Sequence, residues 1–170
     1  MPADPEDVYR RIGELVVGFQ WVENLFRQIG WFLADPHRTV WPPKDFRTGS
    51  TSQLVHRVSK LYEEVIPQLG LPHDHEEEIR EEFSSLVKRF DLLRKQRNRF
   101  LHSAYVELKG GEEIVGLLRA DIKLHIGDSG GSVLDSEILS DASFNHVATE
   151  IGDIGFRLDI RYKELLQRLR

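Results

Sequence analysis

The segment RNRFLH, residues 97–102, holds side chains suited to chemistry on a phosphate. An arginine such as Arg97 can stabilise negative charge that develops on a phosphate oxygen, and Asn98 can orient an anion or a nearby imidazole. Histidine, whose unperturbed pKa is about 6.5, can exchange a proton near neutral pH. His102 supplies such a group here, so no metal ion is required.

A helix is expected to carry these three residues. Apolar residues recur every three or four positions up to Leu93, and the same step continues to Arg97 and Phe100. In a helix, Asn98 and His102 share one face, and Arg97 lies one step round toward the apolar stripe. A buried, unpaired arginine costs on the order of several kcal/mol, so Arg97 should meet an anion, an acid or a second subunit. The structural alternative is an ion pair with an acid of another helix, with His102 as an ordinary helix-end histidine.

Residues 88–99 contain six of the 23 lysines and arginines in the chain and only one acid, Asp91. A basic patch on a chain of formal net charge −5 is typical of a site for a polyanion, which Arg94, Lys95 and Arg99 would contact. The alternative is a solvated face, because cations near the C-terminus of a helix are favoured by its dipole.

The 170 residues, 40% hydrophobic and 30% charged, suffice for one globular domain, which we expect to span residues 1–170. The chain has no cysteine, which excludes disulfides, cysteine-ligated metals and thiol nucleophiles. It opens without an apolar signal segment, and no run approaches about 18 apolar residues. The sequence therefore favours a cytoplasmic protein without a membrane span.

Hydrophobic periodicity predicts four helices and one β region. Asp74 is the expected N-cap of the third helix, Thr51 or Ser52 caps the second, and Trp41 and Phe46 should anchor the loop before it. The fold class is all-α, an antiparallel four-helix bundle with a small β-hairpin between the third and fourth helices. The helices are expected at about residues 8–33, 51–69, 74–102 and 140–169, and a loop at 128–132. The β insertion is expected at about 105–127, as a small hairpin or a three-stranded flap.

The run from Arg97 to His102 resembles the R-x4-6-H motif of HEPN domains, all-α proteins in which a polar residue, often asparagine, follows the arginine. HEPN domains are also similar in their long first helix, the motif at the end of the third helix, and a further long helix that closes the bundle. The resemblance covers most of residues 5–170. It implies a metal-independent, cofactor-free endoribonuclease of the toxin or phage-defence type, acting as a homodimer in which two motifs converge.

The same resemblance implies roles for individual residues. His102 would be the general base or acid, Arg97 would stabilise the phosphate transition state, and Asn98 would orient the phosphate or His102. Attack by the ribose 2′-OH would leave a 2′,3′-cyclic phosphate. The RNA backbone would be bound by Arg94, Lys95 and Arg99.

Tyr105 is a candidate for modification. In some HEPN toxins the motif resembles R-x4-H-x-Y, and a partner antitoxin, a minimal nucleotidyltransferase, adenylylates the tyrosine. This chain reads His102-Ser103-Ala104-Tyr105, which is one residue longer. A tyrosine that opens a β run is otherwise a packing residue.

Other interpretations remain open. His56, His73-Asp74 and Asp91 are similar in order to the metal ligands of HD phosphohydrolases, although His73-Asp74 is more simply a helix start, and no metal site is expected. The main alternative function is a non-catalytic, HEPN-like dimeric adaptor that binds nucleic acid or a nucleotide. A homodimer is favoured by the apolar surface expected from Arg97 and the aromatic residues Trp21, Trp31, Trp41 and Phe100.

Overall fold

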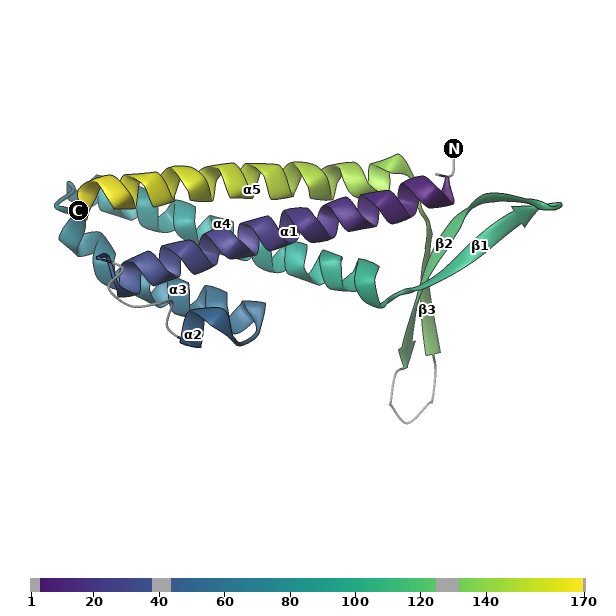
Figure 1. The fold of residues 1–170 in the computed structure, drawn as a ribbon, viewed down its shortest axis with the longest axis horizontal. Coiled ribbons are helices and arrows are strands. Elements are labelled where there is room, and N and C mark those ends of the chain that lie inside the picture. Colours follow the sequence, from purple (N-terminus) through teal and green to yellow (C-terminus); the bar gives the residue numbers. More distant parts are fainter. Residues whose placement is uncertain (1–3, 38–43, 125–131, 170) are drawn as a thin grey trace.

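The computed structural model describes residues 4–37, 44–124 and 132–169. In these parts the chain is mostly helical with a small three-stranded antiparallel sheet (Figure 1), which confirms the prediction of a mainly α-helical protein. The helices are α1 (Pro5–Ala34), α2 (Lys44–Arg47), α3 (Thr51–Val65), the short 3-10 helix η1 (Ile66–Leu69), α4 (His73–His102) and α5 (Asp141–Arg168).

Two of the predicted helix starts are displaced by a residue or two. The cap of α3 is Ser50 rather than Thr51 or Ser52, because Ser50 and Gln53 form a reciprocal capping box. The cap of α4 is Pro72 rather than Asp74, which lies inside the first turn. At this position the carboxylate of Asp74 is still stabilised by the positive end of the helix dipole.

α4 runs antiparallel to α1. The ring of Phe19 stacks on Phe90 with centroids 4.7 Å apart, and Phe26 meets Phe83 edge-on at 6.2 Å. Residues that come later in α1 therefore contact residues that come earlier in α4. α3 is also antiparallel to α4. Tyr62, late in α3, stacks on Phe83 at 3.8 Å, whereas Thr51, at the start of α3, lines a pocket with Arg94, further along α4.

α1 and α5 run in the same direction, which differs from the predicted antiparallel bundle (Figure 1). Arg11 pairs with Asp141 at 2.9 Å near the start of both helices, and the rings of Phe32 and Tyr162 lie 6.0 Å apart near their ends. An antiparallel bundle needs each connection to reverse the chain. α3 also runs parallel to α1, because Thr51 at its start bonds to Glu23 of α1, and Val58, further along α3, lies beside Gly30, further along α1.

Phe46 anchors this connecting segment, as predicted. Its side chain is buried, and its ring lies beside Gly30 of α1 and Val58 of α3, in space that any Cβ on Gly30 would need. Trp41, the second predicted anchor, lies outside the described residues. The close approach of α1 and α3 therefore depends on a glycine and an aromatic ring.

The sheet has three strands, the larger of the two predicted alternatives, and it extends beyond the predicted range of 105–127. A third strand pairs with β2 from Leu118↔Ile138 to Leu124↔Ser132. Only Ser132 of the predicted loop at 128–132 is described, and it opens this strand. The strands are β1 (Ala104–Gly110), β2 (Glu113–Leu124) and β3 (Ser132–Ile138), in the order β1-β2-β3.

The sheet is joined to the helices by buried leucines at its base. Leu117 of β2 and Leu139, which follows β3, are fully buried within the same apolar core as the helices. The backbone N–H of Leu139 donates to the carbonyl oxygen of Leu117 at 3.0 Å. These contacts pack the base of the sheet against the end of the helical core.

Gly30→Ala should destabilise the fold. The added Cβ would lie 2.6 Å from a ring carbon of Phe46 and 2.7 Å from Val58 Cγ2, both in buried side chains. Overpacking of this kind costs about 1–3 kcal/mol in the free energy of unfolding, which urea titration measures.

Gly152→Ala is the matched control, because a Cβ on this helical glycine meets nothing within 4 Å. It should raise the free energy of unfolding by up to about 1 kcal/mol through helix propensity. Equal effects of the two substitutions would contradict the close packing around Gly30.

Candidate functional site

The predicted catalytic residues occupy the last two turns of α4, beyond the reach of α3. Thr51 opens α3 and its hydroxyl donates to Glu23 of α1 at 2.7 Å. On α4, the first turns of α3 reach as far as Arg94, which lines a pocket with them. Residues 97–102 lie further along α4, where α1, α5 and the sheet are its neighbours among the described elements.

Arg97 lies on an aromatic ring. Its guanidinium carbon is 4.5 Å from the ring centroid of Phe19, and the side chain is half-buried. Among the described residues it has neither a hydrogen-bond nor an ion-pair partner. A cation over an aromatic face gains about 0.5–2 kcal/mol, which offsets part of the cost of leaving water. The predicted alternative, an acid from another helix, does not occur among these residues.

Asn98 and His102 lie one turn apart on the same face of α4, as predicted. Asn98 is half-buried, His102 is exposed, and neither has a hydrogen-bond partner in the parts of the chain that the structure describes. Arg97 and His102 are five residues apart, which corresponds to about 140° around the helix. Their side chains therefore leave α4 in different directions.

The basic segment is largely neutralised by carboxylates. Arg94 and Lys95 both pair with Asp91, at 2.7 and 2.9 Å. Hydrogen bonds from Lys95 and then Arg94 hold the pKa of Asp91 below its usual value. Arg89 pairs with Glu150 and Asp153 of α5, and Arg99 with Asp121 and Asp135 of the sheet. Within residues 88–99, Lys88 and Arg97 lack a carboxylate partner among the described residues.

A buried arginine, Arg119 of β2, organises the contact between the sheet and α4. Its guanidinium donates to Asp121 at 2.6 Å, to Glu137 of β3 at 3.2 Å and to the hydroxyl of Ser103 at 3.2 Å. Ser103 also donates to Asp121. Burial alone would raise the pKa of Asp121, but hydrogen bonds from Ser103, Arg119 and Arg99 hold it below the usual value.

Sequence reasoning missed this network, although a signal for it was present. Arg119 and Asp121 are two apart in a strand and so share one face. Their partners on β3, Glu137 and Asp135, lie directly opposite them in the register. Only the third strand brings these residues together, and the sequence left a hairpin and a three-stranded flap open without assigning residues 132–138 to a strand.

Tyr105 is held in place by α4 and α1. Its hydroxyl donates to the carbonyl oxygen of Phe100 at 2.5 Å, and its ring meets Tyr9 edge-on at 6.5 Å. Burial raises the pKa of Tyr105 to about 12. These contacts fit the packing role that was the alternative to modification.

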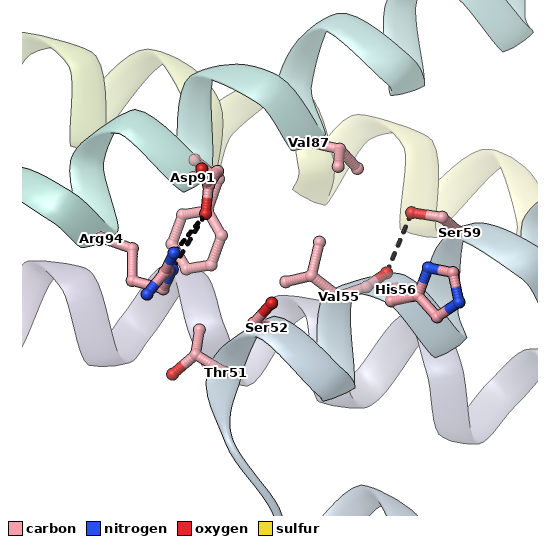
Figure 2. Close-up of a pocket in the computed structure, with 9 residues that line it drawn as sticks. Thr51, Ser52, Val55, His56, Ser59, Val87, Asp91 and Arg94 are labelled. Atoms are coloured by element: carbon pink, nitrogen blue, oxygen red, sulfur yellow. Dashed lines mark hydrogen bonds and ion pairs between the residues drawn. The ribbon is translucent and has the colours of Figure 1, made fainter.

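A cavity of about 210 Å³ lies between the first turns of α3 and the middle of α4 (Figure 2). His56 and Asp91 both line it, but His73 and Asp74 begin α4, about 26 Å away along the helix from Asp91. Among the described residues, no group of three or more His, Asp or Glu side chains is placed to bind a metal. The set similar to HD phosphohydrolases is therefore not brought together.

The aromatic residues expected to favour a dimer differ in their exposure. Phe100 is buried in the core, Trp31 is half-buried, and Trp41 is not among the described residues. Trp21 packs over Gly155 and is 45% exposed. Beside it, Val17 of α1 and two residues of α5, Phe156 and Ile160, are also exposed, so α1 and α5 share an apolar outer face.

Comparisons of the chain with family models, with curated proteins and with solved structures gave no match. The described helices include none with the length and hydropathy needed to cross a membrane. A function for this chain is therefore inferred from its residues and their geometry.

Asp121→Asn should destabilise the protein in a pH-dependent way. The substitution leaves the buried guanidinium of Arg119 with a weaker partner, which costs about 1–3 kcal/mol at pH 7. Because the fold lowers the pKa of Asp121, this contribution is present above the usual aspartate pKa of about 4 and is lost as the pH falls further.

Urea titrations at neutral pH and near pH 3 measure the effect. The difference between wild type and variant should shrink at the lower pH. Asp7→Asn is the control, since among the described residues Asp7 pairs with Arg10 alone, and this ion pair is fully exposed and screened by water. A cost for Asp121→Asn that is the same at both pH values would contradict the network.

Proposed function

We propose that this chain is a HEPN-type, metal-independent endoribonuclease that acts as a homodimer in the cytoplasm. One observation carries the proposal. The cations around the motif are mostly paired, whereas Arg97, Asn98 and His102 have no hydrogen-bond partner among the described residues. Unpaired polar groups that stand together on a helix end are what a phosphate ligand requires.

The proposed reaction is attack of a ribose 2′-OH on the neighbouring phosphate. His102 takes the proton from the 2′-OH, and the new O–P bond forms as the bond to the 5′-oxygen breaks. Arg97 stabilises the negative charge on the phosphate oxygens, and Asn98 orients the phosphate. The leaving 5′-oxygen takes a proton from water, and His102 releases its own proton to solvent, so the products are a 2′,3′-cyclic phosphate and a 5′-hydroxyl.

The directions of the side chains support a site shared by two subunits. Within one chain, Arg97 lies against Phe19 while His102 leaves α4 about 140° away around the helix. Two copies related by a two-fold axis bring His102 of one chain to the phosphate held by Arg97 of the other.

The family assignment rests on the motif and its setting. Three long helices and α3 share one core, and the motif ends the helix that precedes the last one. A bundle of the HEPN type with an inserted sheet is the finer fold assignment that we propose. The biological role is then that of a toxin or phage-defence effector. Its antitoxin would be a minimal nucleotidyltransferase, and modification of Tyr105 would first have to break its bond to Phe100.

RNA binding by Lys95 and Arg99 requires exchange of carboxylate for phosphate partners, whereas Arg94 can donate to RNA from its free Nη1 while it stays bound to Asp91. Their ion pairs are exposed or half-exposed, and such pairs contribute only about 0–1 kcal/mol. The pairing of these cations with carboxylates favours the second candidate function, a dimeric adaptor that binds nucleic acid or a nucleotide without cleaving it. Cleavage separates the two candidates.

His102→Ala and Arg97→Ala should each abolish cleavage of single-stranded RNA. Loss of one donor to a developing anion costs about 3–4 kcal/mol in the barrier, so Arg97→Ala should slow the reaction about 100- to 1,000-fold. Gel analysis of labelled RNA measures the rate, and EDTA should leave the wild-type rate unchanged.

His146→Ala is the matched control, because His146 is an exposed histidine on α5. It should cleave like the wild type. Activity that survives His102→Ala, or that is lost on chelation, would refute the mechanism.

Mixing the two inactive variants tests whether the site is shared. If each site takes Arg97 and His102 from different subunits, half of the dimers are mixed and each has one intact site. Activity should then return to about a quarter of the wild-type rate. Light scattering at micromolar concentration should show dimers throughout. An active wild type without recovery on mixing would place both residues of a site in one chain.

A further inference from the structure

The cavity between α3 and α4 has apolar walls and polar ends. Val55 of α3 and Val87 of α4 approach it from opposite sides (Figure 2), and Phe90 of α4 also lines it. One end carries Asp91 and Arg94, and the other carries His56 and Ser59. A nucleobase has the same distribution, with two apolar faces and a polar edge.

The polar end at Arg94 is fixed in orientation and keeps free donors. Arg94 uses Nε and Nη2 to bind one oxygen of Asp91, which leaves both N–H groups of Nη1 available. The other oxygen of Asp91 binds Lys95 and retains a lone pair. This end of the cavity therefore retains both donors, on Arg94, and an acceptor, on Asp91, which are the groups that the hydrogen-bonding edge of a base pairs with.

Further hydrogen-bonding groups are free around the mouth of the cavity. The Ser59 hydroxyl donates to the carbonyl oxygen of Val55 at 2.9 Å and keeps its own lone pairs. Ser52 and His56 have no hydrogen-bond partner among the described residues. The volume of about 210 Å³ is below the roughly 300–1,000 Å³ of pockets for drug-sized ligands, so it suits one flat ring system.

The cavity and the motif lie on one continuous row of α4. Arg94, Asn98 and His102 are four residues apart and follow one another along the same side of the helix. The rise from Arg94 is about 6 Å to Asn98 and about 12 Å to His102. One or two nucleotides of an extended strand span such a distance.

We infer that this cavity is a base-recognition subsite that takes one unstacked nucleobase of single-stranded RNA, next to the phosphate held by the motif. The inference rests on the proposed function for the identity of the ligand. What it adds is that the cavity residues select where the RNA binds, whereas other groups cleave it. These residues are Val55, Val87, Asp91 and Arg94.

The test is binding of short single-stranded RNA to His102→Ala protein, so that the measurement does not depend on cleavage. The oligomers are A, C and U homopolymers and a U oligomer with a single G. Filling the cavity by Val87→Phe should weaken binding about 5- to 100-fold and reduce any preference among bases. Leu92→Phe, which adds a ring at an exposed position of α4 outside the cavity, should bind like the parent.

Ser52→Phe provides a second variant, because Ser52 is exposed at the cavity mouth and its substitution leaves the core intact. It should weaken binding as Val87→Phe does. Unchanged affinity and base preference in both folded variants would overturn the inference. If Val87→Phe fails to fold, Ser52→Phe alone decides.

Cleavage assays with His102 restored separate this inference from the proposed function. Wild-type cleavage with cut positions that neither cavity variant alters would overturn the subsite and leave the ribonuclease intact. Binding that depends on the cavity, without cleavage by the wild type, would support the subsite and exclude the ribonuclease.

Discussion

Aromatic rings join α1 to α4, and this contact holds the end of α4 in position. Phe19 lies between two groups of α4, since it stacks on Phe90 at 4.7 Å and carries the guanidinium of Arg97 at 4.5 Å. α3 covers this contact only as far as Arg94, so the apolar stripe of α4 continues into a region with one fewer helix. A cation with an apolar stem and a face that stacks on aromatic rings suits that position better than an aliphatic residue exposed to water.

Charge pairing explains why the basic segment is not a simple polyanion surface. Arg89 joins α4 to α5, Arg99 joins α4 to the sheet, and Asp91 accepts both Arg94 and Lys95. Each of these pairs joins neighbouring elements or fixes a side chain on α4. Counting charges along the sequence cannot distinguish such pairs from free cations, because their partners are between three and 64 residues away.

Hydrophobic periodicity was sufficient to predict the long helices and the position of the motif at the end of one of them. It could not predict the direction of α3, because that depends on the length and packing of the segment around Phe46. Periodicity left a hairpin and a three-stranded flap open. It did not locate the third strand, because a buried Arg119 interrupts the apolar pattern of its partner β2. The sequence also could not show whether Arg97 would form an ion pair, because an acid from any helix could have been its partner.

The acidic side chains of the sheet make the electrostatic potential differ between the two sides of His102. The network there contains three carboxylates and two guanidinium groups, and the exposed residues of the β1–β2 hairpin include Glu107, Glu112 and Glu113 against Lys109. A polyanion that passed from His102 across the sheet would move into an increasingly negative potential. The opposite route, along α4 toward Arg94, has no such barrier. A bound nucleic-acid strand would therefore extend toward α3 on one side of His102 and turn away into solvent on the other.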